Sequence, residues 1–496
     1  MSELYRKTPI MGWASWNCFR TAISEEVLAA QMDALVNSGL AECGYTYFNM
    51  DDGFFGGRDE NGRLKFHAER FPNGIKPVAD RAHSLGLKAG CYSDGGDNTC
   101  AYYYDNEQDN GIGVGLYGHD EQDLNMFLDE FGFDFIKVDW CGGVRHCLDE
   151  EERYTKIASV IDDIRKRTGR CIVFNICRWR FPGEWAVGIA DSWRTGADIT
   201  PDFKSVMQQL DNIKCLKKYC SPGHVNDPDM MQIGNGLTPE EEKTHFIMWC
   251  MVSAPLMIGC DLTKTDAGTL ELLKNKEIIA IDQDPLCLQG YVIKEYRSED
   301  GGIAGEIWYK KLYSENGARR AAAFVNRGET ELKMSVSAGE LGFDGGITGI
   351  RDAFRGKDLD TAEEIEVTVL PHGCEVFTIE GGKCSEVEDI NGSLEFDLDW
   401  SPNEISHGEA KKLAENGALL IDVRSAEEYG AGHINGAINI PHTKIFDEIE
   451  KYAKDKKNDV IITYCKTGKR CSQAKLSLEY LYYDNLYTLK WNGEQL

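Results

Sequence analysis

One apolar segment of this 496-residue chain ends in two opposite charges. It reads Phe133-Asp134-Phe135-Ile136-Lys137-Val138-Asp139-Trp140, a short apolar and aromatic run that is typical of a buried β-strand. Lys137 and Asp139 stand two residues apart, so both side chains point to the same face of the strand. Because buried charges must be paired, this motif alone predicts either a structural ion pair or an active-site pair, and both interpretations stay open at this point.

Charged and aromatic residues follow other strand-like segments in the same way. Eight such segments alternate with helical stretches such as 24–38, 121–131 and 150–167, and a glycine-rich loop follows the segment 45–52. This alternation predicts an α/β fold with a (β/α)8 barrel over residues 1–288. A single carboxylate at a strand end could be a helix N-cap, but seven of the eight segments end in charged or aromatic groups. We therefore expect an active site at the carboxyl rim of the barrel, with acidic candidates at Asp51, Asp52, Asp94, Asp139, Asp198 and Asp229.

The composition of this rim indicates sugar chemistry. Aromatic side chains accompany the carboxylates, at Trp13, Trp16, Tyr92, Trp140 and Trp179. Aromatic faces stack on sugar rings, and two carboxylates that flank a glycosidic bond can act as nucleophile and acid/base. Carboxylate-rich rims also hold Mg²⁺ or Mn²⁺, but Lys137 and Arg194 would each repel a cation. We predict no metal and no cofactor.

Five motifs in order carry a resemblance to a known family. They are Met11-Gly12-Trp13-Ala14-Ser15-Trp16-Asn17, Asp51-Asp52-Gly53, Lys137-Val138-Asp139-Trp140-Cys141, Trp193-Arg194-Thr195-Gly196-Ala197-Asp198 and Asn226-Asp227-Pro228-Asp229-Met230. In type and spacing, from about residue 8 to about residue 290, the chain resembles the melibiase-type α-galactosidases of glycoside hydrolase family 27. Each motif is weak alone, whereas five in order are specific.

The resemblance implies a retaining hydrolase that releases a terminal α-linked galactose or a close analogue. Asp139 then matches the nucleophile and Asp198 the general acid/base. We expect Lys137 to favour the ionised form of Asp139, whereas Asp198 must hold a proton in the resting enzyme. An Asp-Asp pair is commonly a turn or a cap, but here it matches the hydroxyl-binding set. That set comprises Asp51, Asp52, Lys137, Arg194 and Asp229, with Trp16 and Tyr92 as pocket walls.

The chain departs from the family pattern at Cys177-Arg178-Trp179, where the family usually carries Cys-Glu-Trp and the Glu touches the sugar at carbon 2. A guanidinium donates where a carboxylate accepts, so Arg178 leaves galactose, N-acetylgalactosamine and β-L-arabinopyranoside as alternatives. The small residue pair that admits an N-acetyl group is absent and residues 180–182 are bulky, which favours a free 2-hydroxyl. Cys100 and Cys141 match a cysteine pair near the family's active site, and their redox state is open.

The remaining chain predicts two further domains and a linker. Four short strands with turns between them, at 305–310, 320–326, 364–370 and 373–379, predict an antiparallel β-sandwich over residues 289–380, with a structural role. Residues 381–403 are Gly-rich and acidic, as expected of a linker. Residues 404–496 predict a small α/β domain in which Cys465 leaves the apolar strand 459–464 just before a helix.

Cys465 has the setting of a thiolate. Backbone N–H groups of the loop, the helix dipole and the cations Lys466, Lys469 and Arg470 lower a thiol pKa, and an ordinary buried cysteine would not occupy such a loop. The segment resembles the rhodanese domain through Asp422-Val423-Arg424 and the six-residue loop from Cys465 to Arg470. That loop length fits a sulfurtransferase that carries a persulfide, because the related dual-specificity phosphatases have a loop one residue longer. Residues 490–493 depart from the usual double glycine, and turnover, docking and sensing remain alternatives.

Composition limits the partners of the chain. A formal net charge of −28 argues against nucleic-acid binding, which needs Lys/Arg-dense faces. The first residues lack an apolar signal region and no run of about 18 apolar residues occurs, so we expect neither secretion nor a membrane span. Seventeen cysteines in such a chain predict mostly reduced thiols and a cytoplasmic protein. We expect an α-galactoside-type small-molecule or oligosaccharide substrate, and a homo-oligomer stays an alternative to a monomer. An inactive carbohydrate-binding or redox-sensing protein is the alternative from another class, against which the intact Asp139 and Asp198 argue.

Overall fold

The computed structural model describes residues 7–299, 301–315, 317–382, 384–392, 404–456, 458–481 and 483–496. The chain forms two compact units, which are described one at a time. The first contains the barrel and the β-sandwich, and the second contains the C-terminal α/β domain. Within the described residues, no helix has both the length and the apolar character needed to cross a membrane.

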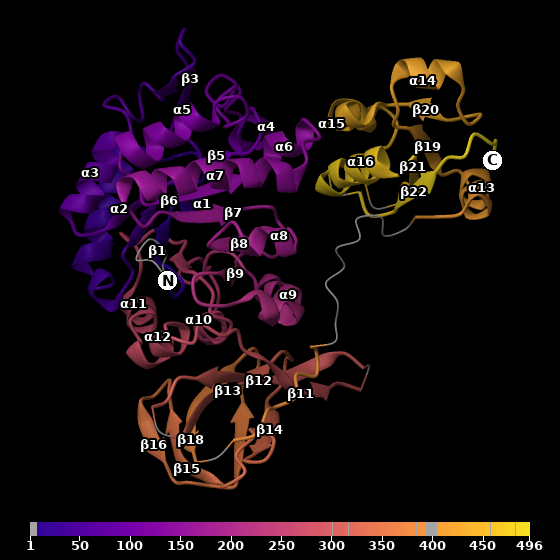
Figure 1. Ribbon diagram of the computed structural model, residues 1–496. Helices are drawn as coiled ribbons and strands as arrows, with labels where there is room; N and C mark the ends of the chain where they lie inside the picture. The colour runs from indigo at the N-terminus through magenta and orange to yellow at the C-terminus, as the bar shows by residue number, and fades with distance from the viewer. Residues whose placement is uncertain are drawn as a thin grey trace. The chain divides into compact units, whose positions relative to one another are not determined.

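Eight parallel strands form the sheet of the barrel, in the order β10-β1-β2-β5-β6-β7-β8-β9 (Figure 1). The ring closes after β9, where the Met231 N–H donates to the Met257 carbonyl at 2.7 Å and Met231 bridges to Ile258. The (β/α)8 barrel predicted from the sequence is confirmed. The strands are β1 (Met11–Ala14), β2 (Tyr47–Asn49), β5 (Lys88–Asp94), β6 (Phe135–Asp139), β7 (Val173–Ile176), β8 (Ser192–Arg194), β9 (Val225–Asp227) and β10 (Leu256–Ile258).

Helices follow the barrel strands and begin where capping residues allow. Ser24 accepts the N–H of Val27 at the start of α2, and Thr238 with Glu241 forms a capping box at the start of α10. The helical segments are α1 (Trp16–Phe19), α2 (Glu25–Asn37), η1 (Ala41–Cys43), α3 (Lys76–Ser84), α4 (Cys100–Tyr104), α5 (Asp120–Leu124), η2 (Asn125–Glu130), α6 (Cys141–Arg145), α7 (Glu150–Thr168), α8 (Glu184–Val187), α9 (Phe203–Ile213), η3 (Lys214–Tyr219), α10 (Pro239–Met251), α11 (Ala267–Leu273) and α12 (Lys276–Asp282).

Two details of the barrel differ from the sequence predictions. The helix expected over 121–131 continues from α5 into η2, which is a π-helix rather than an α-helix. The glycine-rich stretch after β2, expected as a loop, contains an antiparallel hairpin of β3 (Phe55–Arg58) and β4 (Leu64–Phe66). Both segments lie outside the barrel sheet, so neither difference alters the strand ends that carry the site.

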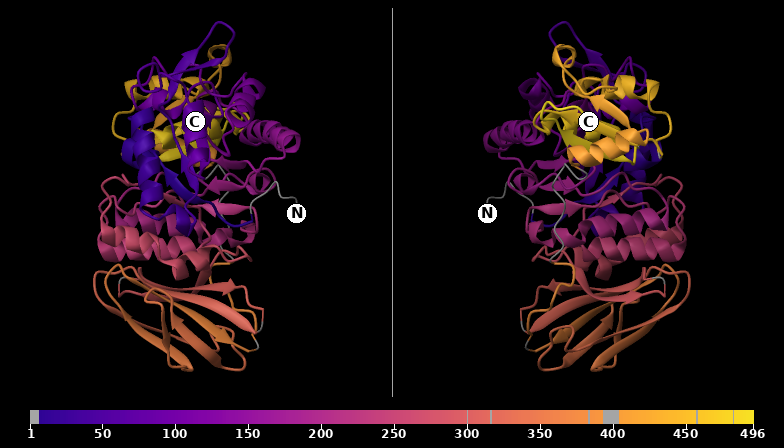
Figure 2. Two further views of the ribbon diagram at one scale, coloured as in Figure 1. Left: turned by 90° about the vertical axis from the view of Figure 1, so that its left-hand side faces the viewer. Right: turned by 90° about the vertical axis from the view of Figure 1, so that its right-hand side faces the viewer.

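The β-sandwich pairs a six-stranded sheet, in the order β11-β12-β13-β18-β15-β16, with a two-stranded sheet, β14-β17. Its strands are the orange arrows of Figure 2. The four strands expected from the sequence correspond to β12, β13, β17 and β18. The full set is β11 (Tyr291–Arg297), β12 (Ile303–Leu312), β13 (Ala318–Asn326), β14 (Leu332–Ser337), β15 (Ile347–Asp352), β16 (Lys357–Leu359), β17 (Glu364–Val369) and β18 (Cys374–Gly381).

A buried lysine joins the sandwich to the barrel. Lys310 of β12 is fully buried, and its Nζ donates to the Cys250 carbonyl at 2.7 Å and to the Ser253 hydroxyl at 2.8 Å. Cys250 lies in the last turn of α10, where a cation also interacts favourably with the helix dipole. The sandwich therefore completes the polar end of a barrel helix.

The C-terminal domain is built on a parallel four-stranded sheet, in the order β20-β19-β21-β22. Isoleucines of β19, β20 and β21 and leucines of α16 and β22 contribute to its apolar core. Residues 393–403 of the predicted linker lie outside the described residues. The elements are α13 (His407–Glu415), β19 (Leu419–Asp422), α14 (Ala426–Ala431), β20 (Ile438–Asn439), η4 (His442–Lys444), α15 (Ile445–Glu448), η5 (Ile449–Lys451), β21 (Ile461–Cys465), α16 (Lys469–Tyr480) and β22 (Leu486–Lys490).

Candidate functional site

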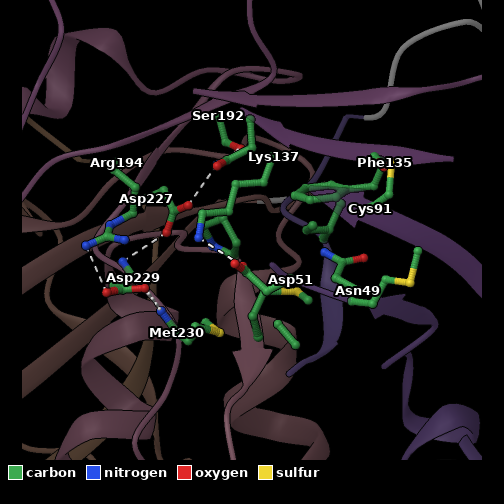
Figure 3. Close-up of a pocket in the computed structure, with 16 residues that line it drawn as sticks. Asn49, Asp51, Cys91, Phe135, Lys137, Ser192, Arg194, Asp227, Asp229 and Met230 are labelled. Atoms are coloured by element: carbon green, nitrogen blue, oxygen red, sulfur yellow. Dashed lines mark hydrogen bonds and ion pairs between the residues drawn. The ribbon is translucent and has the colours of Figure 1, made fainter. Parts of the chain in front are cut away.

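A lysine connects two carboxylates at the rim of the barrel. The Nζ of Lys137, on β6, donates to Asp51 Oδ2 at 2.9 Å (Figure 3). The same Nζ lies 3.6 Å from Asp139 Oδ2. Asp51 follows β2, whereas Asp139 is the last residue of β6. β2 and β6 are separated in the sheet by β5, and their carboxyl ends bring together groups that are far apart in the sequence. Lys137 and Asp139 form an ion pair, and the same lysine holds a third charged residue.

Arg194 likewise connects two carboxylates, at the ends of β8 and β9. Arg194 ends β8, and its Nη2 lies 2.8 Å from Asp229 Oδ2 and 3.1 Å from Asp198 Oδ1. Asp229 is buried, whereas the side chain of Asp198 is 63% exposed. The backbone of Asp229 lies in the left-handed region at φ 86°, which is uncommon for a residue with a side chain. Arg194 therefore joins one enclosed and one solvent-facing carboxylate.

Two cavities open at this rim. The first is small, about 50 Å³, and is lined by Asp51, Lys137, Arg194, Asp227 and Asp229 among others (Figure 3). The second, of about 600 Å³, is lined by Asp198 and Trp16, two residues that the sequence assigned to the same site. Each of the buried carboxylates Asp51, Asp139 and Asp229 has Lys137 or Arg194 within 3.6 Å. The side chains of Lys137 and Arg194 therefore supply the positive charge that balances these carboxylates.

Burial controls the acidity of the rim. It raises the pKa of Asp139 to about 6, against the opposing effect of Lys137, and the charges of Asp51 and Asp198 raise it further. It likewise raises the pKa of Asp229 to about 6, against Arg194. Lys137 does favour the ionised form of Asp139, as expected, but its effect is smaller than that of burial. At neutral pH the charged form of Asp139 still predominates, as a nucleophile requires.

The positions of Asp52 and Tyr92 differ from those of the other candidates. Asp52 is buried and accepts the N–H groups of Gly53 at 2.8 Å and Ala101 at 2.9 Å, and burial raises its pKa to about 7. The Tyr92 ring lies 5.3 Å from Lys137 Nζ, and its hydroxyl accepts the N–H of Cys100 at 3.3 Å. Asp52 therefore binds the first turn of α4, and Tyr92 forms a wall beside Lys137. Their contacts with a sugar stay predictions.

The thiol of Cys465 lies at the end of β21 within a short loop. It is buried and accepts the Gly468 N–H at 3.2 Å, with further N–H donors at Thr467 and Cys471. The Cys471 thiol and these N–H groups lower the pKa of Cys465 to about 5, against the opposing effect of burial. This residue is therefore a thiolate at neutral pH, as the sequence predicted.

Two arginines near this loop are paired with carboxylates, whereas Lys466 is exposed. Arg470 Nη2 donates to Glu428 Oε1 at 3.0 Å, and Arg424 Nε donates to Asp422 Oδ1 at 2.9 Å. Arg424 also stacks on Trp491, with 4.4 Å between the guanidinium carbon and the ring centroid. The side chain of Lys469 lies outside the described residues. The thiolate thus depends on main-chain donors and a neighbouring thiol, with Arg470 turned toward Glu428.

Comparison with known proteins assigns both parts of the chain. The model of the alpha galactosidase A family matches residues 8–284. The chain belongs to the melibiase-type α-galactosidase family. It is 37% identical to alpha-galactosidase 2 of Arabidopsis thaliana over 379 residues, which span 75% of this chain and 89% of that protein. It is 35% identical to alpha-galactosidase A of Cellvibrio japonicus over 402 residues, which span 76% of this chain and 93% of that protein.

A solved structure and a second family model extend the assignment. Alpha-galactosidase I of Mortierella vinacea superposes with a TM-score of 0.68 at 25% identity and covers 76% of this chain and 98% of its own. The rhodanese-like domain model matches residues 406–491. This member of the melibiase family therefore carries a rhodanese-like domain after its β-sandwich, and the resemblances noted in the sequence are confirmed.

Several polar residues of this α-galactosidase-family site were not singled out from the sequence. Asn175 on β7 donates to Asp227 Oδ2 at 2.8 Å and to the Ser192 hydroxyl at 2.8 Å. Cys177 is buried, and its sulfur accepts from Arg194 Nη1 at 3.6 Å. Their positions on or directly after a predicted strand could have identified them. Uncharged side chains are also common in strand interiors, so their type alone does not mark a site.

Arg178 and Cys100 complete the account of the predicted residues. Arg178 follows Cys177 and is buried, with its guanidinium carbon 5.7 Å from the Trp179 ring centroid. The backbone of Trp179 is in the left-handed region at φ 55°, so the chain turns directly after Arg178, the residue that differs from the family motif. Cys100 and Cys141 are both disulfide-bonded, whereas fifteen other cysteines are free.

Proposed function

We propose that the barrel hydrolyses terminal α-galactosides with retention of configuration. The named relatives are α-galactosidases, and one observation in this chain carries the mechanism. Asp139 is buried beside Lys137, whereas Asp198, held by Arg194, lines the outer cavity. An enclosed carboxylate suits a nucleophile, and a solvent-facing one suits an acid/base that must exchange protons with water.

In the first step, an Asp139 oxygen attacks the anomeric carbon while Asp198 gives its proton to the departing oxygen. The glycosidic bond breaks and a glycosyl ester forms on Asp139. In the second step, Asp198 takes a proton from water, whose oxygen attacks the same carbon and releases Asp139. Two inversions give net retention, and Asp51, Lys137 and Asp229, which line the inner cavity, hold the sugar hydroxyls at the rim of the barrel.

A panel of three aryl glycosides tests this proposal: the α-galactoside, the α-N-acetylgalactosaminide and the β-L-arabinopyranoside. We expect aryl release chiefly from the α-galactoside, with α-galactose as the first anomer seen by proton NMR. Release chiefly from one of the other two glycosides would show that the barrel has that specificity instead, as the arginine at position 178 allows. No release from any of the three would overturn the hydrolase proposal, and β-galactose as the first anomer would overturn retention.

We also propose that the C-terminal domain is a sulfurtransferase. Cys465 as a thiolate would attack the outer sulfur of thiosulfate, the sulfur–sulfur bond would break, and sulfite would leave with the electron pair. The product is a Cys465 persulfide. Thiocyanate formation from thiosulfate and cyanide by the whole protein measures this activity. Its absence, together with no sulfur added to Cys465, would leave the domain with a binding role.

A further inference from the structure

A second thiol lies beside the thiolate of the rhodanese-like loop. Cys471 is the third residue of α16, in the first turn after the loop, and like Cys465 it is fully buried. Its thiol donates to the Leu489 carbonyl of β22 at 3.8 Å, and the next residue of that strand, Lys490, pairs with Cys465 in the sheet. Both cysteines belong to the same apolar core and both are free. The chain therefore holds a dithiol at the point where it would carry sulfur.

The two members of this pair are chemically unequal. The neighbouring Cys471 thiol and the backbone N–H groups lower the pKa of Cys465, whereas burial and the charge on Cys465 raise that of Cys471. At another buried cysteine, Cys220, the thiol donates to the Cys287 carbonyl at 3.3 Å, and its contact with Cys287 together with burial raises its pKa. A low-pKa sulfur that can carry a persulfide therefore lies beside a thiol that still holds its proton.

We propose that Cys471 resolves a persulfide on Cys465, releasing sulfide and leaving a Cys465–Cys471 disulfide. The inference rests on the proposed sulfurtransferase function, which supplies the persulfide. The Cys471 sulfur attacks the Cys465 sulfur, and the bond from Cys465 to the outer sulfur breaks. The outer sulfur leaves as sulfide and takes the Cys471 proton. The two cysteines are oxidised by two electrons and the outer sulfur is reduced by two, so no other oxidant is consumed.

This chemistry gives the domain a product other than a transferred sulfur atom. Each turn would convert one sulfane sulfur to hydrogen sulfide, and the disulfide would then need an external dithiol to reopen it. The loop would therefore work as a sulfide-releasing reductase with thiosulfate as the sulfur donor and a dithiol as the electron donor.

The test uses the full-length protein, reduced with a dithiol, freed of it and kept without oxygen. Thiosulfate is added without cyanide, thiols are blocked by alkylation, and sulfide and tryptic peptides are measured. Trypsin cuts after Lys466 and Arg470, so peptides 458–466 and 471–475 separate unless a disulfide joins them. Variants Cys471→Ser and Cys471→Ala remove the second thiol, and Cys220→Ser is the matched control for loss of a buried cysteine.

We expect the wild type and Cys220→Ser to release about one sulfide per chain and to yield the joined peptides. The Cys471 variants should release none and should carry about 32 Da of added sulfur on peptide 458–466. A wild type that keeps this added sulfur, with separate peptides, would overturn the inference and leave the sulfurtransferase proposal standing. If no variant acquires sulfur, both proposals fail. Even if the Cys471 variants do not fold, the wild-type peptide map distinguishes the disulfide from the retained persulfide.

Discussion

The two reactive sites of this chain are built in opposite ways. The barrel site gathers charges from separate strands, from Asp51 after β2 to Asp229 after β9, and burial raises the pKa of its acids. The thiol site lies within residues 465–471, where main-chain donors and a neighbouring thiol lower the pKa of Cys465. A site assembled by tertiary structure depends on charge partners, whereas a site made by one loop depends on local backbone geometry.

The largest effect is expected at the nucleophile. Asp139→Asn removes the attacking oxygen, so α-galactoside cleavage should fall by about 10⁴-fold or more in kcat. Asp163→Asn, an exposed substitution on α7, is the control and should leave the rate unchanged. Initial rates of aryl release measure both. Activity of Asp139→Asn within about tenfold of wild type would remove Asp139 from the mechanism.

The next prediction separates the two sites. Cys465→Ser removes the thiolate, and thiocyanate formation should fall by about 10³-fold or more, to the background rate. Aryl α-galactoside cleavage by the same variant should match wild type, because its carboxylates belong to the barrel. A parallel loss of both activities would show that the sites are coupled and would break the comparison.

Lys137 tests whether the barrel site depends on charge partners. Lys137→Met should lower kcat/KM by about 10²-fold, because a donor and the positive charge beside Asp139 are lost. Since Lys137 lowers the pKa of Asp139, its loss should also move the acidic limb of the pH profile to higher pH. Lys137→Arg keeps the charge and should restore the position of that limb. An unmoved limb in Lys137→Met would contradict this role.

The two sites should also lose activity at different pH. Asp139 must be ionised to attack, so kcat/KM for cleavage should fall by about tenfold per pH unit below a pH of about 6. Alkylation of Cys465 needs the thiolate and should persist down to a pH of about 5. Between these values the thiol stays reactive while cleavage declines. If cleavage and alkylation lost activity at the same pH, this would contradict the opposite effects of burial on the pKa of Asp139 and of backbone donors on that of Cys465.

The smallest effect is expected from one glycine of the loop. Gly468 has φ 87°, and an added Cβ would meet Lys490 Cε at 3.0 Å. Gly468→Ala should cost about 1 kcal/mol and weaken the N–H donated to Cys465, so alkylation at pH 6 should slow several-fold. Gly417→Ala, at φ 94° with open space around it, carries the same backbone strain and is the control. Equal rates for the two variants would show that the Gly468 donor is unimportant.

The positions of the residues at the strand ends could be predicted from the sequence, whereas the acidity of those residues could not. The positions of Asp51, Asp139 and Asp229 at one rim followed from alternation, because parallel strands share a carboxyl edge. The net rise in the pKa of Asp139 could not be predicted, since it depends on how much water the folded chain excludes. Edge strands of the sandwich such as β16, with three exposed residues, have no apolar pattern to detect.

The thiol loop shows the same division between local and distant information. Cys465 could be recognised from a strand, a loop and a helix in succession, because all three are local in the sequence. Its contact with Cys471 depends on how α16 folds back over β21, which the spacing of two cysteines does not reveal. Asp52 is comparable: its main-chain acceptor role at Ala101 joins segments 49 residues apart.

The buried lysine of the sandwich has a practical consequence for protein engineering. Ten of the thirteen residues of α10 are buried, and Lys310 is bonded to the carbonyl of Cys250 near its end. A chain cut after residue 288 would expose that helix and leave the Cys250 carbonyl without its partner. The shortest portion worth expressing as a hydrolase therefore extends through β18 to Gly381, and the barrel is best treated as inseparable from the sheet beside it.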